Sequence, residues 1–214
     1  MCKTHKKSLF LLAALVVMCI AATGSAVADP VIFTGGASYQ GGQFGLSVVD
    51  KGSNTYAITY TANFANWTGG NLYISGIDFK FGSDLETAGS LVSTTAAGTW
   101  TLHDPSGSLT GGAIGTNGCQ TNTGATFVCA DVTPYNSNAT AGSYQWVFNI
   151  TYANPLTSSD FDYNNDHIGA LFVNSSGNSR GILSTGMANN VPEPMSATLL
   201  GVGLLGFGFK RFKK

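Results

Sequence analysis

The densest group of metal-binding side chain types lies between residues 160 and 166. Oxygen-bearing side chains occupy alternating positions there, at Asp160, Asp162, Asn164 and Asp166. This spacing matches the first, third, fifth and seventh ligands of a calcium-binding loop. Such a loop also has a glycine at its sixth position and a bidentate glutamate at its twelfth, where this chain has Asn165 and Leu171. We therefore expect a solvated acidic loop and no cofactor, with calcium as the alternative.

Two histidines with acidic neighbours are the next candidates for chemistry, because histidine is the commonest general base. They are His103, which precedes Asp104, and His167, which follows Asp166. Neither lies in a Gly-x-Ser-x-Gly or His-Glu-x-x-His motif. No feature singles out a pair of carboxylates for glycoside cleavage. We therefore expect a protein that is not an enzyme, and a secreted polysaccharide hydrolase is the enzymatic alternative.

The tryptophans suggest sugar binding, since an exposed aromatic face can stack on a sugar ring. Trp146 lies within an alternating apolar stripe and is expected in the core. Trp67 precedes the turn residues Gly69 and Gly70, which makes it the candidate for an exposed platform. Partial burial at the edge of a sheet is the preferred interpretation for Trp67. A lectin-like, carbohydrate-binding module remains an alternative function.

Alternating apolar residues predict the elements that would position these side chains. Strands of this kind, with one buried and one wet face, are expected around 44–48, 56–64, 77–81, 144–152, 168–173 and 181–184. Turn residues separate them, and a short capped helical turn is expected at 157–161. The pattern predicts an all-β, antiparallel β-sandwich of about 8–10 strands over residues 29–187, followed by a linker at 188–190.

The charge of this domain is acidic, although the whole chain has a formal net charge of −1. Seven of the ten basic residues lie before residue 29 or after residue 190. The segment between them has three basic residues, Lys51, Lys80 and Arg180, and ten acidic residues, so its formal net charge is about −7. An acidic domain with few lysines and arginines repels phosphate backbones, so we expect no nucleic-acid partner.

The first 28 residues have the layout of a secretory signal peptide. A basic start is followed by an apolar run at 9–22 and by the small residues Ala26 and Ala28 at positions −3 and −1 of a cut before Asp29. The apolar run is short for a membrane-spanning helix, which needs about 20 residues. We therefore expect export through the Sec machinery and removal of residues 1–28.

The last 24 residues form a second processing signal. Pro192, Glu193 and Pro194 precede an uncharged, apolar segment at 195–209, and a basic cluster follows at 210–214. An apolar helix followed by lysine and arginine stops in the membrane with its charges on the cytoplasmic side. The two prolines favour extended backbone outside that segment, where a processing enzyme can reach it.

These three parts, in this order behind a signal peptide, resemble the PEP-CTERM sorting signal of Gram-negative bacteria. The resemblance covers residues 191–214 only. It implies that a membrane-embedded exosortase recognises Pro192, Glu193 and Pro194, which would then be recognition residues for another enzyme. It also implies passage through the inner membrane to the cell surface or extracellular matrix.

Only Cys119 and Cys129 would remain after signal removal, because the other two cysteines lie in the first 28 residues. The oxidising export route and the turn-rich residues between them predict a disulfide that staples a hairpin. A reactive or metal-binding thiol pair is the alternative, although the sequence shows no cluster of His and Cys around them.

Together these features predict an exported surface or matrix protein, a structural or adhesive component of biofilm, floc or exopolysaccharide. Its expected partners are the Sec machinery, an exosortase, the membrane before processing, and exopolysaccharide or other surface proteins.

Overall fold

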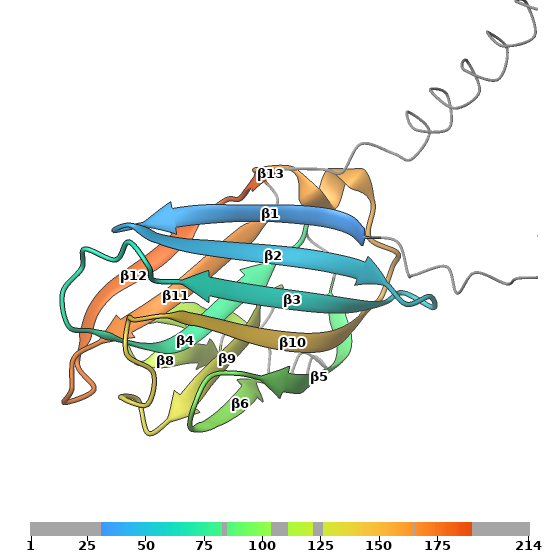
Figure 1. Ribbon diagram of the computed structural model, residues 1–214. Helices are drawn as coiled ribbons and strands as arrows, with labels where there is room; N and C mark the ends of the chain where they lie inside the picture. The colour runs from blue at the N-terminus through green and yellow to red at the C-terminus, as the bar shows by residue number, and fades with distance from the viewer. Residues whose placement is uncertain (1–30, 83–84, 104–110, 122–125, 165, 190–214) are drawn as a thin grey trace, which may run out of the picture. The chain divides into compact units, whose positions relative to one another are not determined.

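The computed structural model describes residues 31–82, 85–103, 111–121, 126–164 and 166–189. The described residues form antiparallel β-sheets and one 3-10 turn, which confirms the predicted all-β class. Two of the sheets pack face to face, as Figure 1 shows. The predicted signal peptide (1–28), its cleavage residues Ala26, Ala28 and Asp29, and the sorting signal (191–214) lie outside the described residues.

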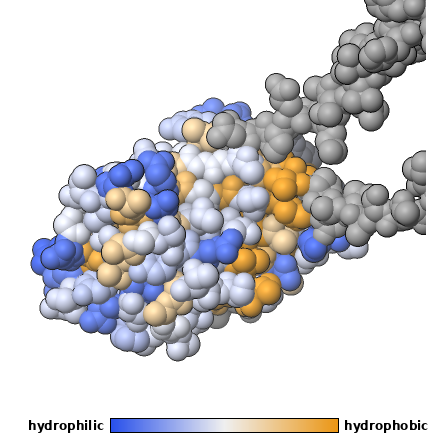
Figure 2. All heavy atoms as spheres, viewed as in Figure 1, coloured by the Kyte–Doolittle hydropathy of each residue, from blue (hydrophilic) through white to orange (hydrophobic). Residues whose placement is uncertain are grey.

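The six-stranded sheet has the order β13-β1-β2-β3-β10-β5. Its strands are β1 (Val31–Tyr39), β2 (Gly42–Asp50), β3 (Thr55–Asn63), β5 (Glu86–Thr94), β10 (Ser143–Tyr152) and β13 (Ala188–Asn189). Its outer face is the one seen in Figure 2, where pale and hydrophilic residues predominate. Alternation explains this face: along β10, Trp146, Phe148 and Ile150 are buried while Asn149 between them is exposed.

The five-stranded sheet has the order β12-β11-β4-β9-β6. Its strands are β4 (Tyr73–Lys80), β6 (Thr99–His103), β9 (Val128–Thr133), β11 (His167–Val173) and β12 (Ser179–Thr185). The predicted pairing of 168–173 with 181–184 is confirmed as the β11–β12 hairpin, closed by a turn in which Asn174 N–H donates to the Asn178 carbonyl.

Aromatic side chains from both sheets fill the space between them. Trp146 of β10 is fully buried, as predicted, and meets Tyr60 of β3 and Trp100 of β6 edge to face at 5.6 and 4.9 Å between ring centroids. Such edge-to-face pairs stabilise a core beyond the area that they bury. This core covers the inner face of the five-stranded sheet. The outer face of the same sheet can then be covered by other elements.

A short hairpin covers that outer face. It consists of β7 (Gly111–Gly115) and β8 (Gly118–Thr121), and it packs over β4, β9 and β11. A second, smaller apolar cluster lies beneath it, built from Ile114, Cys129, Leu171 and Val173. Because of this cover, residues of the five-stranded sheet that would otherwise face solvent become buried.

The described residues contain thirteen strands, more than the 8–10 expected. The additional strands include short ones in the β7–β8 hairpin and β13. The predicted helical turn is confirmed as η1 (Ser158–Phe161), where the Asp160 carboxylate accepts the Thr157 N–H at 2.7 Å. Within the described part of the chain, no helix is long and apolar enough to cross a membrane. The predicted hydrophobic segment at 195–209 lies outside that part.

Candidate functional site

The outer face of the five-stranded sheet carries a row of chemically active side chains. In the strand register Gly169 is opposite Asp78, Asp78 is opposite Cys129, and Cys129 is opposite His103. Side chains at paired positions lie on one face of a sheet, about 5 Å apart. Strand pairing therefore gathers residues that are up to 91 positions apart in sequence.

Asp78 lies at the centre of this row and is completely buried. One oxygen, Oδ2, accepts the backbone N–H of Ile114 at 2.7 Å and so ties the β7–β8 hairpin to β4. Gly169 leaves space for the carboxylate, because a Cβ at that position would lie 1.9 Å from Asp78 Oδ1. Burial raises the pKa of Asp78 to about 7, although the Ile114 N–H opposes this shift.

His167 lies beside Asp78, with Nε2 3.7 Å from Asp78 Oδ1. This separation exceeds hydrogen-bond range, and neither atom has another hydrogen-bond partner among the described residues. Burial, followed by the neighbouring positive charge of Lys80, lowers the pKa of His167 to about 4. At neutral pH the imidazole is therefore uncharged.

Phe127 completes the surroundings of His167. Its ring meets the imidazole edge to face at 5.0 Å between centroids, and Lys80 Nζ lies 5.4 Å from the centre of the same ring. The lysine charge is thus held on the aromatic ring by a cation–π contact.

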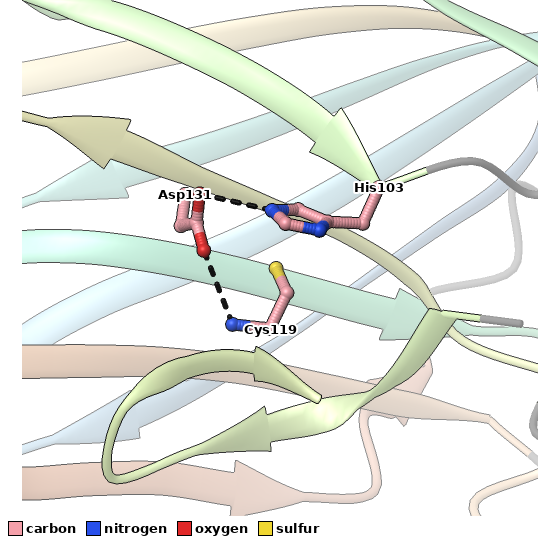
Figure 3. Close-up of side chains that lie close together, drawn as sticks. All are labelled: His103, Cys119 and Asp131. Carbon is pink, nitrogen blue, oxygen red and sulfur yellow. Dashed lines mark hydrogen bonds and ion pairs between the residues drawn. The ribbon is translucent and has the colours of Figure 1, made fainter. Parts of the chain in front are cut away.

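A second His–Asp pair lies at the other end of the row. His103 Nε2 is 3.0 Å from Asp131 Oδ1, and Asp131 Oδ2 accepts the Cys119 N–H at 3.2 Å. Figure 3 shows the three side chains converging from β6, β9 and β8, with the Cys119 sulfur directed towards the gap between imidazole and carboxylate. The ligand-type atoms of His103, Cys119 and Asp131 all lie within 4.8 Å of one another.

Cys119 is bonded to Cys129, which confirms the predicted disulfide. We expected the bond to join the two strands of one hairpin. It instead links β8 of the covering hairpin to β9 of the five-stranded sheet. Cys129 is fully buried and Cys119 is half-buried. The disulfide thus tethers the hairpin at one end of the row, and Asp78 holds it in the middle.

Trp67 lies away from this row, in the loop between β3 and β4. It is half-buried, its Nε1–H donates to the Gly70 carbonyl at 2.8 Å, and its ring packs against Phe172 at 4.9 Å between centroids. The partial burial expected for it is therefore confirmed. The indole is held in one orientation by the hydrogen bond and by the ring beneath it.

A cleft of about 560 Å³ opens beside Trp67. Its lining comes from the β3–β4 loop, from the start of β4 and from the loop before β10: Trp67, Thr68, Gly70, Asn71, Tyr73, Ala139, Thr140 and Ala141. Two aromatic side chains thus share the cleft with an amide and two hydroxyl groups. No carboxylic acid is among these eight lining residues.

The oxygen-bearing side chains of the calcium alternative do not form a cluster among the described residues. The Asp160 carboxylate accepts hydrogen bonds from Thr157, Asp162 and Asn164 are exposed, and Asp166 Oδ1 accepts the Met187 N–H at 2.8 Å. Among the acidic, histidine and cysteine side chains that the structure describes, the three that cluster as a metal-ligand set are His103, Cys119 and Asp131. Asp160 instead anchors a turn, and Asp166 anchors the segment between β12 and β13.

The sequence did not reveal the grouping of His103 with the cysteines. His103 and Asp131 alternate with inward-facing neighbours, which are the buried Trp100 and half-buried Leu102 in β6 and the buried Ala130 and Val132 in β9. That alternation places both side chains on the outer face. His103 and Asp131 are 28 residues apart, however, and no local sequence pattern predicts that β6 pairs with β9.

No protein-family model matches this chain, and no curated protein matches it significantly.

Proposed function

We propose that this protein is exported, sorted by an exosortase, and retained as a structural or adhesive component of the cell surface or extracellular matrix. The observation that carries the proposal is the order of the three tail parts: Pro192-Glu193-Pro194, the apolar segment 195–209 and the basic cluster 210–214, behind a signal peptide. An apolar segment with basic residues after it holds the chain at the membrane with the motif outside.

Two properties of the described domain support this proposal. The Cys119–Cys129 disulfide fits an oxidising compartment, since such bonds persist mainly in exported proteins. An acidic domain rich in small polar residues also remains soluble at high local concentration, because like charges repel. Both properties suit a protein that accumulates outside the cell.

The sorting motif can be tested by replacing Pro192, Glu193 and Pro194 with alanine in the full chain. We expect this variant to stay in the inner-membrane fraction with its tail intact, while the parent reaches the surface or matrix. Pro155→Ala, at an exposed loop position of the domain, is the matched control and should be sorted normally. Normal delivery of the triple variant would contradict the proposal.

The Trp67 cleft supports a second candidate function, binding of a carbohydrate. A pre-oriented indole beside Tyr73 supplies apolar ring faces, and the Asn71 amide can hydrogen-bond to sugar hydroxyls. The hydroxyl oxygens of Thr68 and Thr140 donate to backbone carbonyls and can accept from a sugar hydroxyl. Without a carboxylic acid in its lining, the cleft suits recognition without cleavage, because glycoside hydrolysis uses two carboxyl groups. The ligand would be a neutral polysaccharide segment of the cell's own matrix.

Binding of purified matrix polysaccharide by single-site variants tests this candidate. Trp67→Ala and Asn71→Ala should each weaken binding about tenfold or more, which corresponds to roughly 1.4 kcal/mol. Tyr163→Ala removes an aromatic residue that is 56% exposed outside the cleft, and it should bind as the parent does. Asn71→Ala leaves the Trp67–Phe172 contact intact, so its result does not depend on a change in folding. Equal binding by all three variants would exclude the cleft as the binding site.

A further inference from the structure

The grouping of His103, Cys119 and Asp131 offers three donor types that zinc prefers: an imidazole nitrogen, a sulfur and a carboxylate oxygen. In the structure Cys119 is engaged in the disulfide, so its sulfur is not a thiolate. The chain is synthesised with thiols, however, and the disulfide forms only when an oxidant removes two electrons. Before that event, Cys119 carries a free thiol.

We propose that His103, Cys119 and Asp131 bind Zn²⁺ whenever Cys119 is not in its disulfide. The site has three protein ligands, and its fourth position is open to solvent. Zinc and the disulfide are then alternative ways of fastening the β7–β8 hairpin to the five-stranded sheet.

The distances are close to those that zinc requires. With Zn–S near 2.3 Å and Zn–N near 2.05 Å, tetrahedral ligands lie about 3.6 Å apart. The ligand atoms of the three residues already lie within 4.8 Å of one another, and His103 Nε2 is 3.0 Å from Asp131 Oδ1. Rotation of the side chains, which moves their ligand atoms by about 1 Å, therefore brings these atoms to the tetrahedral separation without movement of the strands.

The surroundings also suit a metal site. His103 and Asp131 have side chains that are 30% and 20% exposed, so an ion can enter from solvent. Asp131 Oδ2 accepts the Cys119 N–H, which leaves Oδ1 directed at the site and fixes the carboxylate. Gly118 leaves room for that carboxylate, because a Cβ there would lie 2.7 Å from Asp131 Oδ2.

The chemistry balances in both directions. Binding replaces the thiol proton: Cys119–SH and Zn²⁺ give Cys119–S⁻–Zn²⁺ and one H⁺. Release follows when a disulfide oxidant R–S–S–R meets the zinc-bound thiolate and the Cys129 thiol. The Cys119–Cys129 bond forms, two R–SH are produced from R–S–S–R with the Cys129 proton and one proton from solvent, and Zn²⁺ leaves.

The proposal is tested without reductant by the Cys129→Ser variant, which leaves Cys119 as a free thiol beside His103 and Asp131. We expect it to bind one Zn²⁺ by calorimetric titration, and one Co²⁺ with a thiolate-to-cobalt charge-transfer absorption. The matched control is Cys119→Ser, which leaves a free thiol at the buried Cys129 and should bind neither ion. The disulfide-bonded parent should bind neither ion.

Ligand identity is tested in the Cys129→Ser background. His103→Gln and Asp131→Asn should each weaken zinc binding at least about 100-fold, since loss of even an outer-shell partner costs 10- to 100-fold. His167→Gln, at the histidine of the other His–Asp pair, should leave the affinity unchanged. The proposal is wrong if Cys119→Ser binds zinc as well as Cys129→Ser does, or if the His103 and Asp131 variants bind normally.

A second measurement covers the case in which Cys129→Ser is unfolded without metal. Circular dichroism of the parent, reduced with a phosphine, should then show recovery of its β spectrum when Zn²⁺ is added. Absence of both zinc binding and zinc-dependent refolding would overturn the proposal.

Discussion

Among single residues, Asp78 and His167 are neighbours, and burial shifts the pKa of each. Their pKa values move in opposite directions, to about 7 for Asp78 and to about 4 for His167. Between pH 4 and 6.5 the unfolded chain holds one proton on this pair, at His167. The folded protein also holds one proton, at Asp78. The pair therefore adds no pH dependence to the free energy of unfolding in this range.

Removing either partner should make the free energy of unfolding depend on pH, with opposite signs for the two variants. In Asp78→Asn only His167 titrates, so the unfolded state binds more protons and stability relative to the parent should rise from pH 4 to 6.5. In His167→Gln only Asp78 titrates, so the folded state binds more protons and relative stability should fall from about pH 4 to 7. Each slope is limited to about 1.4 kcal/mol per pH unit.

Urea unfolding of both variants and the parent at intervals between pH 4 and 7 measures these slopes. Comparison with the parent at each pH removes the contribution of Asp166, whose pKa burial raises to about 6. If the free energy of unfolding of the two variants changed with pH in the same way, the pKa shifts assigned to Asp78 and His167 would be contradicted.

Gly169 provides a second test at this scale. A methyl group there would collide with Asp78 Oδ1 and lie 3.1 Å from the Leu183 carbonyl. Gly169→Ala should lower the free energy of unfolding by about 1–3 kcal/mol through overpacking. Because much of the collision involves the carboxylate, the same change should cost less in an Asp78→Ala background. Additive effects in this double-mutant cycle would show that the two side chains do not compete for one space.

At the scale of elements, the disulfide fixes the β7–β8 hairpin over the buried row. Its cysteines are separated by 10 residues, and a loop of that size stabilises the protein by about 2–3 kcal/mol in the chain-entropy account. The Cys119→Ser/Cys129→Ser double variant should therefore unfold at a lower urea concentration. The slope of its free energy of unfolding against urea concentration should be similar to that of the parent. Chemical denaturation in zinc-free buffer measures this, and a midpoint equal to that of the parent would contradict a stabilising tether.

Which elements could be predicted from the sequence depended on how they are buried. β3, β10 and β11 bury one face or both with large apolar residues, so alternation or continuity revealed them. β5 escaped prediction because it is an edge strand of small polar residues, and most of its positions are exposed. β1 was missed because Gly35 and Gly36 interrupt its apolar pattern. The β7–β8 hairpin contains four glycines and few apolar residues, and tertiary contacts define it.

The candidate sites divide in the same way. The disulfide and the half-buried Trp67 followed from composition and local turn residues. The proximity of His103 to Cys129 and of His167 to Asp78 followed from strand register between distant segments, which no local pattern encodes. The alternating oxygens at 160–166 looked like a metal loop, yet the turn at η1 directs Asp160 towards Thr157.

At the scale of the whole molecule, the two ends and the domain differ in composition and charge. The ends hold seven of the ten basic residues, and their predicted role is delivery. The domain between them is acidic, disulfide-linked and all-β, and its Trp67 cleft is the proposed contact with matrix polysaccharide. Removal of both ends would therefore change a nearly neutral chain into an acidic domain.

Mass spectrometry of the protein recovered from the surface or matrix fraction of cells that make the full chain tests this account most directly. The account predicts a chain that begins at Asp29, has been cleaved near Pro192–Pro194, and is two hydrogens lighter because Cys119 and Cys129 are bonded. A protein that stays inside the cell with residues 1–28 and 195–214 attached would contradict it.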